Sequence, residues 1–495
     1  MKAFAKTAHA PVQPGVVYDR ALVEKDRDYR GTAVQSKPNF ILINIDDLGY
    51  ADIEPFGSKL HRTPNLSRMA AEGMKLTSFY AAPVCSPSRA SLMTGCYPKR
   101  VGIPAVLFPG NATGLNAREH TVAELLKARG YATACIGKWH LGDQPEFLPT
   151  RHGFDSYFGL PYSNDMGPAA DGVKSNLGDP LPKPGKSPGQ PPLPLLRNEA
   201  VLQRVLANDQ TTLAARYTEE AVKFLRTNQD KPFFLYLPHT AVHFPLYPGK
   251  AFQGKSRNGL YGDWVEEVDW SVGQILQTVR ELQLSDKTFV CFVSDNGGTP
   301  RAVNSPLRGN KASTWEGGMR VPAIAWWPGK IPAGASSDAV ASMMDILPTL
   351  VKLAGGEMPA DLKIDGHDLW PVLSGQSKTS TYEAFYYFNG NRLDAVRSGS
   401  WKLQLLTPGR PAQPANTALQ PPKLYNLNND LGETTDVAAQ NPDVVKTLQE
   451  FVAKMDADLG QTQLGPGCRP PGRVTNARPL IDHQGNIREG FAAGN

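Results

Sequence analysis

Two short apolar segments, each ending in a pair of polar residues, constrain the fold of this chain most strongly. Segment 39–45 (NFILINI) ends in Asp46-Asp47, and segment 288–294 (TFVCFVS) ends in Asp295-Asn296. Continuous apolar, β-branched runs of this length are typical of buried strands in parallel sheets. Because ligands bind beyond the carboxyl ends of such strands, we expect the two polar pairs to mark a binding edge of the sheet.

Helical periodicity alternates with further strand-like segments. Apolar residues recur at steps of three and four over 213–224 and 265–279, and the strand-like segment 233–237 lies between them. Thr63-Pro64 supplies the N-cap and first position of an earlier helix. The alternation predicts an α/β fold in which a large mixed, mostly parallel sheet is sandwiched by helices.

The pattern changes near residue 380. Four strand-like segments (385–388, 393–396, 401–406 and 423–427) precede an amphipathic helix over 444–459, which predicts a smaller antiparallel sheet with one helix. The expected organisation is an N-terminal arm (1–37), a main α/β domain (38–378), a C-terminal subdomain (379–462) and an irregular tail (463–495). The Pro/Gly-rich segments 167–196 and 408–422 are predicted to be long surface loops.

Composition excludes several classes of protein. Hydrophobic residues make up 41% of the chain and charged residues 20%, which is typical of a globular protein rather than a disordered one. No apolar run approaches the roughly 18 residues that a transmembrane helix needs. The 52 basic and 47 acidic residues give a net charge of +5 without a polybasic cluster, so we expect no nucleic-acid partner. The 5 cysteines are too few and too scattered for a disulfide framework or a zinc site.

The N-terminal segment contains lysines but no apolar core, so no signal peptide is visible. We expect a periplasmic or secreted protein if a leader was removed, and otherwise a cytoplasmic one.

The polar pairs at the strand ends supply oxygen ligands. The carboxylates of Asp46, Asp47 and Asp295 with the amide oxygen of Asn296 form a set that suits a hard divalent cation. The alternative is that each pair caps a helix or a turn. Two such pairs at two strand ends favour the metal site.

The segment 85–95 (CSPSRASLMTG) carries a second chemical signal. Ser86 as N-cap and Pro87 as first helical residue place Cys85 just before a helix N-terminus, where free N–H groups favour anions. Arg89, one turn further on, adds a fixed set of donors. These residues indicate a cysteine nucleophile or an anion-binding site, with a structural role as the alternative.

The run 85–89 resembles the Cys-x-Pro-x-Arg signature of the type I, formylglycine-dependent sulfatases. Further blocks resemble the same family in order: 46–50 (DDLGY), 137–142 (GKWHLG), 294–297 (SDNG), 311–318 (KASTWEGG), 345–349 (DILPT) and 424–427 (LYNL). The resemblance covers about residues 38–460 and is strongest to the arylsulfatase A and N-acetylgalactosamine-6-sulfatase branch. It implies an alkaline phosphatase-like fold and a sulfuric ester hydrolase.

The resemblance also implies cofactors and partners. Cys85 would be oxidised to formylglycine by a formylglycine-generating enzyme before folding, and the hydrate of that aldehyde would be the nucleophile. Ca²⁺, with Mg²⁺ as the alternative, would be held by Asp46, Asp47, Asp295 and Asn296. The substrate would be a small-molecule or carbohydrate sulfate ester, and a homo-oligomer is compatible with the sequence.

The resemblance to the sulfatase family also implies roles for the other residues in the matching blocks. Arg89 and Lys138 would stabilise the ionised hydroxyl of the hydrate, and His140 would be the base that expels sulfate. Lys311 and His243 would clamp the sulfate, and one of them would protonate the leaving alcohol. Ser163 resembles a substrate-pocket serine that supports the histidine. His239 is the lesser candidate beside His243, and Asn164 stands where relatives often have histidine.

Two other functions remain open at this point. A phosphonate monoester or phosphodiester hydrolase of the same superfamily would share the Cys85 block, because similar tetrahedral anions fit one metal site. A non-catalytic protein that binds sulfated glycans would keep the cleft but not the turnover.

Overall fold

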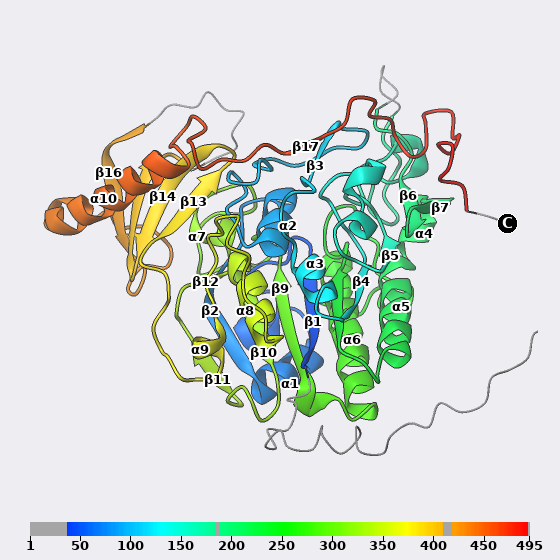
Figure 1. Ribbon diagram of the computed structural model, residues 1–495, viewed down its shortest axis with the longest axis horizontal. Coiled ribbons are helices and arrows are strands. Elements are labelled where there is room, and N and C mark those ends of the chain that lie inside the picture. The colour runs from blue at the N-terminus through cyan, green and yellow to red at the C-terminus, as the bar shows by residue number, and fades with distance from the viewer. Residues whose placement is uncertain (1–36, 184–188, 409–417, 494–495) are drawn as a thin grey trace, which may run out of the picture. The chain divides into compact units, whose positions relative to one another are not determined.

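The computed structural model describes residues 37–183, 189–408 and 418–493, so the predicted N-terminal arm lies outside the described residues apart from Lys37. Within them, an eleven-stranded sheet has the strand order β11-β2-β10-β9-β1-β8-β4-β5-β6-β7, with β12 paired to β2 (Figure 1). Its strands are β1 (Asn39–Ile45), β2 (Met74–Tyr80), β4 (Ala132–Ile136), β5 (Ser156–Gly159), β6 (Pro194–Arg197), β7 (Ala200–Arg204), β8 (Phe233–Pro238), β9 (Thr288–Ser294), β10 (Arg320–Trp326), β11 (Ala335–Ser337) and β12 (Ala341–Ser342).

The centre of this sheet is parallel, as the sequence predicts. β1 lies between β8 and β9 and runs parallel to both, and β4 continues the parallel arrangement on the far side of β8. The strands towards the edges are mixed: β10 is antiparallel to β9 and β2, and β6 is antiparallel to β5 and β7. The fold class is therefore confirmed as a large mixed, mostly parallel sheet.

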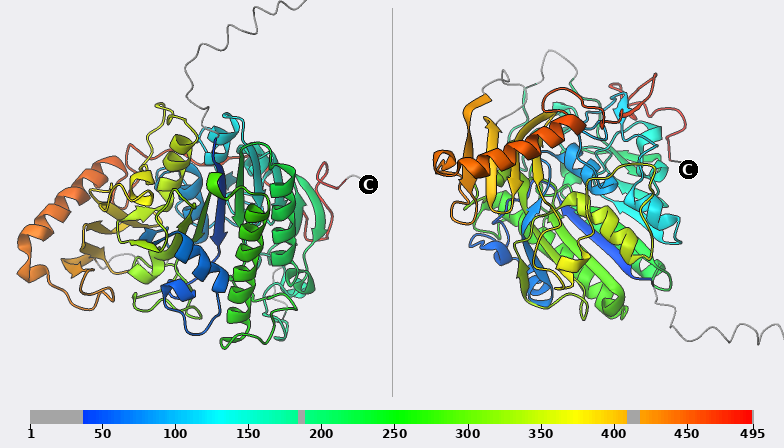
Figure 2. Two further views of the ribbon diagram at one scale, coloured as in Figure 1. Left: turned by 90° about the horizontal axis from the view of Figure 1, so that it is seen from below. Right: turned by 60° about the vertical axis from the view of Figure 1, so that its left-hand side comes forward.

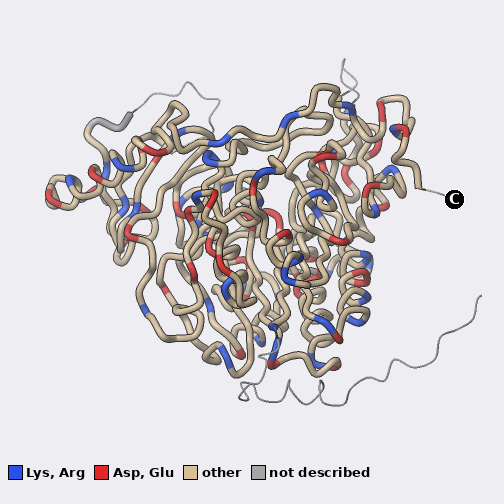
Figure 3. The backbone as a smooth tube through the Cα atoms, viewed as in Figure 1, with Lys and Arg blue, Asp and Glu red and all other residues tan. Residues whose placement is uncertain are grey.

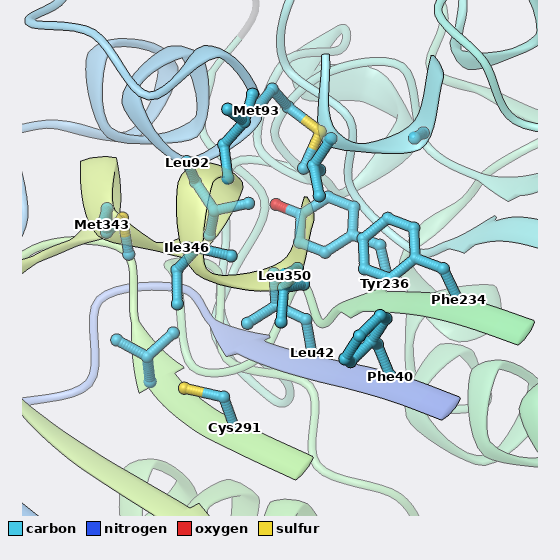
Figure 4. Close-up of a cluster of buried hydrophobic side chains, with 14 of the residues drawn as sticks. Phe40, Leu42, Leu92, Met93, Phe234, Tyr236, Cys291, Met343, Ile346 and Leu350 are labelled. Carbon is cyan, nitrogen blue, oxygen red and sulfur yellow. The ribbon is translucent and has the colours of Figure 1, made fainter. Parts of the chain in front are cut away.

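Helices cover both faces of the sheet (Figures 1 and 2). They are α1 (Pro64–Glu72), α2 (Cys85–Thr94), α3 (Val122–Lys127), α4 (Ala207–Gln210), α5 (Leu213–Thr227), α6 (Gly259–Glu281), α7 (Glu316–Met319), α8 (Ile346–Leu353) and α9 (Trp370–Leu373). Alternate residues of β1 face opposite sides, as strand geometry requires. Phe40 and Leu42 pack with α2 and α8 (Figure 4), and Ile41 and Ile43 pack in the cluster that contains α1, α5 and α6.

Local sequence signals explain where two of the helices begin. Pro64 occupies the first position of α1, where its missing N–H costs nothing. α3 begins with a capping box, in which Thr121 Oγ1 accepts the N–H of Glu124 and the Glu124 carboxylate accepts the N–H of Thr121. Each bond satisfies a donor that the helix itself leaves unpaired.

A second, four-stranded antiparallel sheet follows, as predicted. It consists of β13 (Phe385–Asn389), β14 (Arg392–Ser398), β15 (Trp401–Leu406) and β16 (Ala418–Asn426), and α10 (Pro442–Asp458) packs on it (Figure 2). Leu448, Phe451, Val452 and Met455 of α10 share one hydrophobic cluster with the strands. Tyr80 and Met319 belong to the same cluster, so this sheet is packed against the end of the larger sheet.

The tail and one predicted loop are more ordered than expected. β17 (Gly472–Arg473) pairs with β3 (Thr113–Gly114), which ties the tail to the larger domain. Segment 167–196 was predicted to be a surface loop, but Asp171 and Val173 are buried and β6 begins at Pro194. The prediction is therefore wrong near the two ends of this segment, whereas residues 178–183 are exposed as expected of a surface loop. Of the second predicted loop (408–422), residues 409–417 lie outside the described residues, and residues 418–422 belong to strand β16 rather than to a loop.

Basic residues (blue) and acidic residues (red) are intermixed along the backbone trace in the view of Figure 3. No helix of the described residues combines the length and the apolar character that a membrane crossing requires.

Candidate active site

The two polar pairs meet because β1 and β9 are adjacent and in register. Ile45 pairs with Ser294, so Asp46-Asp47 and Asp295-Asn296 leave the sheet side by side. The N–H of Asp47 donates to Asp295 Oδ1 at 3.3 Å, and Asn296 Nδ2 donates to Asp47 Oδ1 at 2.8 Å. The backbone of Asp47 has a φ of 64°, a left-handed conformation that turns the chain sharply at the strand end.

α2 delivers Cys85 and Arg89 to this edge. The helix begins at Cys85 with Val84 as N-cap, so the prediction that Ser86 caps it is wrong. Ser86 instead accepts the N–H of Leu107 with its hydroxyl oxygen, while Pro87 falls within the first turn, where proline is tolerated. Cys85 is 2% exposed, and burial raises the pKa of its thiol even though Lys138 and Lys311 oppose this.

Arg89 and Lys138 neutralise the carboxylates from inside the protein. Arg89 donates through Nε and Nη2 to Asp295 Oδ2, at 3.0 and 2.7 Å, and through Nη1 to the carbonyl oxygen of Lys138 at 2.6 Å. Lys138 Nζ lies 2.5 Å from Asp46 Oδ2. Burial opposes ionisation of Asp46, but Lys138, His243 and Arg89 outweigh it and lower its pKa. Burial and the nearby Asp46 charge raise the pKa of Asp295 to about 7.

The position of Lys138 depends on the glycine before it. Gly137 has a φ of 131°, and a Cβ at this position would lie 1.8 Å from the carbonyl oxygen of Pro238. β4 therefore approaches the end of β8 closely enough for the N–H of Lys138 to donate to that same oxygen at 2.7 Å. This close approach explains the Gly-Lys pair of the 137–142 block.

Lys311, His243 and Ser163 complete the cluster on its outer side. Lys311 Nζ lies 2.6 Å from Asp47 Oδ1, and His243 Nε2 lies 3.7 Å from Asp47 Oδ2. Ser163 Oγ is 3.3 Å from both His243 Nδ1 and Lys138 Nζ, so it links these two side chains. His243 Nδ1 also donates to the carbonyl oxygen of Phe244 at 2.5 Å.

His140 lies beside this cluster in an unusual backbone conformation, with a φ of 63°. Its Nε2 donates to the carbonyl oxygen of Leu107 at 2.9 Å, so Nδ1 carries the lone pair, and that atom has no partner in the described part of the chain. Burial, together with Lys138 and Arg89, lowers the pKa of His140 well below its ordinary value. A neutral imidazole with one free lone pair is the form that a general base needs.

The lesser candidates lie elsewhere. His239 is a core residue whose Nε2 contacts Ser271 Oγ at 3.1 Å, and burial lowers its pKa to about 4. Asn164 donates to Gln210 and to the carbonyl oxygen of Pro245, so it holds a loop in place.

The donor set fits a hard divalent cation. Among the described residues, Asp46 Oδ1 and Asn296 Oδ1 are buried without a hydrogen-bond partner. Donor atoms of Asp46, Asp47 and His243 lie within 4.8 Å of one another. Unpartnered buried oxygens are costly unless something binds them, and burial together with the nearby Asp46 charge raises the pKa of Asp295 in the same place. A divalent cation bound here would coordinate the unpartnered oxygens and offset the negative charge of the carboxylates.

The sequence alone did not reveal how the Lys311 loop is held. Lys402 Nζ donates a hydrogen bond to the backbone carbonyl oxygen of Thr314, three residues after Lys311, at 2.8 Å. Lys402, from β15, also lies 3.1 Å from Glu316 Oε1 and 2.7 Å from Glu433 Oε1, with all three side chains fully buried. The C-terminal sheet therefore anchors the loop that presents Lys311.

Replacing Lys402 with methionine should leave two buried carboxylates without their shared cation. We expect Lys402→Met to lower the free energy of unfolding by about 3–5 kcal/mol, as for other broken buried ion pairs. Lys454→Met, an exposed lysine on α10, is the control and should stay within about 0.5 kcal/mol of the parent. Chemical denaturation of the three proteins measures this, and equal stabilities would show that the cluster contributes nothing.

The sequence of this chain is similar to those of known proteins over most of its length. The sequence profile for Sulfatase matches residues 38–356, and the profile for the C-terminal region of aryl-sulfatase matches residues 380–474. Arylsulfatase A of Homo sapiens is 38% identical, with 89% of this chain and 93% of the relative covered. N-acetylgalactosamine-6-sulfatase of Canis lupus familiaris is 36% identical, with 94% and 97% covered. Steryl-sulfatase of Mus musculus is 38% identical, with 85% and 81% covered.

Solved structures agree with the fold. The crystal structure of Ps i-CgsB in complex with k-i-k-neocarrahexaose superposes with a TM-score of 0.71 at 30% identity, covering 87% of this chain and 95% of the other. The PsFucS1 sulfatase from Pseudoalteromonas sp. gives a TM-score of 0.72 at 28% identity, covering 87% and 92%. The phosphonate monoester hydrolase of Agrobacterium radiobacter shares the fold. It superposes with a TM-score of 0.60 at 20% identity, covering 89% of this chain and 100% of the other.

Proposed function

This chain belongs to the sulfatase family and is a sulfuric ester hydrolase, and we propose that its reaction takes place where Cys85 meets the paired strand ends. One observation carries the proposal: the helix that begins at Cys85 meets Asp46, Asp47 and three cationic side chains in one buried cluster. A sulfate monoester needs a nucleophile, neutralisation of charge and protonation of the leaving oxygen. The cluster contains groups suited to each task.

Cys85 is proposed as the site of formylglycine, whose hydrate supplies an oxygen nucleophile for attack on sulfur. The thiol itself is a poor candidate, because burial raises its pKa and so disfavours the reactive thiolate. At 2% exposure the side chain is also out of reach of another enzyme in the folded chain. We therefore propose that a formylglycine-generating enzyme acts on this segment before folding.

Asp46, Asp47, Asp295 and Asn296 are proposed to hold Ca²⁺, with Mg²⁺ as the alternative. The donors are all oxygen, and two of them, Asp46 Oδ1 and Asn296 Oδ1, have no partner among the described residues. A divalent cation bound there supplies Lewis acidity and orients the sulfate group.

Arg89 and Lys138 are proposed to stabilise negative charge on the nucleophile. Both are fully buried, and Arg89 is held in place by two hydrogen bonds to Asp295. His140 is proposed as the base that restores the aldehyde and expels sulfate, because its Nδ1 carries a free lone pair. The three carboxylates, a dication and the cations Arg89, Lys138 and Lys311 sum to +2, which suits an anionic ester.

Lys311 and His243 are proposed to bind the sulfate oxygens and to protonate the leaving alcohol. They form the side of the cluster that reaches solvent, so they face the group that departs. Ser163 is proposed to position His243 through the 3.3 Å contact between its Oγ and Nδ1.

The substrate is proposed to be a small-molecule or carbohydrate sulfate ester. The names of the relatives refer to aryl, amino sugar and steryl sulfatases, and one structural neighbour was solved in complex with k-i-k-neocarrahexaose. The domain boundaries, the oligomeric state and the cellular compartment stay predictions.

Rates on a nitrophenyl sulfate and on a nitrophenyl phosphodiester, measured with one preparation, test the proposed substrate class. We expect the sulfate ester to have the higher kcat/KM. A clear preference for the phosphodiester would contradict the proposal and favour the phosphonate monoester and phosphodiester hydrolases of the same fold. Absence of turnover on both would favour a protein that only binds sulfated glycans.

A further inference from the structure

Exposure is unevenly distributed across the candidate active site. The side chains of Asp46, Arg89 and Lys138 have no exposed surface, whereas His243 is 12% exposed and Lys311 is 18% exposed. A substrate therefore reaches the cluster across His243 and Lys311. The group attached to the sulfate extends outward past these two residues, so side chains beside them contact the part that differs between sulfate esters.

Arg301 is an exposed residue on the loop that follows β9 and Asn296. Its neighbour Ala302 packs tightly on two glycines: a Cβ added to Gly49 would lie 2.9 Å from the Cβ of Ala302, and one added to Gly298 would lie 2.3 Å from it. Gly49 and Gly298 each follow a polar pair by two residues. The backbone next to Arg301 is therefore fixed against both loops that carry the proposed metal ligands.

The guanidinium of Arg301 lies over the ring of Phe244, with Cζ 5.6 Å from the ring centroid. Phe244 directly follows His243 and is itself partly exposed. The cation is thus held beside the solvent-facing side of the site. No carboxylate of the described residues forms an ion pair with Arg301 within 4.0 Å. A cation–π contact orients the guanidinium but leaves its N–H donors available to an oxyanion.

Arg308, on the same loop, provides a contrast. Its guanidinium also lies over an aromatic ring, that of Trp315, at 3.8 Å. Its Nη1, however, donates to the carbonyl oxygen of Glu433 at 2.8 Å, so it joins the loop to the C-terminal sheet. The Arg308 guanidinium is therefore used within the protein, whereas Arg301 is exposed and lies against the ring of the residue that follows His243.

We propose that Arg301, oriented by Phe244, binds a second oxyanion of the substrate, in addition to the sulfate that is cleaved. This rests on the proposed function, because it takes the cluster around Cys85 as the place of cleavage. The substrate class is then a carbohydrate that carries, near the scissile sulfate ester, either a carboxylate or a further sulfate. Guanidinium recognises both through paired N–H···O bonds.

Competitive inhibition of nitrophenyl sulfate hydrolysis tests this without knowledge of the natural substrate. Two matched pairs of inhibitors are used: an O-sulfated N-acetylglucosamine, a monoanion, against the N,O-disulfated glucosamine, a dianion, and a sulfated glucose against the equivalent sulfated glucuronate. The parent protein should bind at least one dianion about tenfold more tightly than its monoanionic partner, the scale of a charge-assisted hydrogen bond. The pair that shows the preference distinguishes sulfate from carboxylate.

Three variants test whether Arg301 causes the preference for the dianion. Arg301→Gln should remove most of it, Arg301→Lys should keep part of it, and Arg226→Gln, an exposed arginine at the end of α5, should keep all of it. A preference that persists in Arg301→Gln, or its absence from the parent for both pairs, would overturn the proposal. So would an equal weakening of monoanion and dianion in Arg301→Gln. Failure of the parent to hydrolyse nitrophenyl sulfate would instead count against the proposed function.

Discussion

Replacing Cys85 with alanine should reduce sulfate ester hydrolysis by at least about 10⁴-fold, the scale seen when an enzyme loses its nucleophile. Alanine keeps the helix N-terminus and its N–H groups but cannot be converted to formylglycine. Cys85 is buried at the start of α2, and the charges of Lys138 and Lys311 act on its thiol. Because alanine removes only the sulfur atom, we expect the fold and the proposed metal site to survive. Steady-state rates on a nitrophenyl sulfate measure the effect.

Cys135→Ala is the matched control. Cys135 is also fully buried, but it lies within β4 in the hydrophobic cluster. Its removal tests whether losing any buried sulfur lowers activity through stability alone. We expect this variant to keep most of the activity at a somewhat lower melting temperature. Turnover that survives in Cys85→Ala would refute the assignment of the nucleophile.

Removal of the divalent cation should have the second-largest effect. After chelation, activity on the aryl sulfate should fall by at least about 10³-fold, because the charge at the sulfate and the orientation of the nucleophile both depend on the cation. Readdition of Ca²⁺ should restore it. Ca²⁺ at 100 times its dissociation constant should also stabilise the chelated protein by about 2.7 kcal/mol, which a thermal melt detects independently of activity.

Asp46→Asn separates this site from incidental cation binding. It removes one proposed ligand charge and the partner of Lys138, so the Ca²⁺-dependent rise in melting temperature should disappear. Asp171→Asn breaks an ion pair of similar length, with Arg204, far along the chain and should keep the Ca²⁺ response. A parent protein whose melting temperature and activity ignore both chelator and Ca²⁺ would contradict the metal site.

The parts of this site that depend on strand ends could be predicted from the sequence. A buried strand such as β1 has a continuous apolar run, so its end and the polar residues after it are visible without a structure. Adjacent parallel strands then bring their ends together, which is why Asp46 and Asp295 meet although they lie 249 positions apart.

Features that depend on contacts between distant loops were harder to predict from the sequence. The sequence favours Ser86 as the N-cap because its hydroxyl can accept a helix N–H, but Val84, whose side chain cannot cap, holds that position, and the Ser86 hydroxyl accepts the N–H of Leu107. A single residue cannot show which partner it will find, because that partner comes from another loop. The same reason explains why the burial near the start of segment 167–196 was not predicted: Val173 packs on residues distant in the sequence.

Two features of the site were not predicted from the sequence. Lys402 is an ordinary lysine in the sequence, and only the packing of the C-terminal sheet brings it between the buried carboxylates of Glu316 and Glu433. Arg301 is one arginine in a glycine- and proline-containing loop. Its significance comes from the packing of Ala302 and from the ring of Phe244, which is contributed by a different part of the chain.

The mass of the peptide that contains Cys85 tests the central claim most directly. Trypsin cleavage after Lys75 and Arg89 releases residues 76–89, which contain no other cysteine. In protein produced with a formylglycine-generating enzyme, we predict a peptide in which the CH₂–SH group has become an aldehyde, so that the peptide no longer reacts with iodoacetamide and forms a hydrazone. Active protein whose peptide carries only the unmodified thiol would contradict this account.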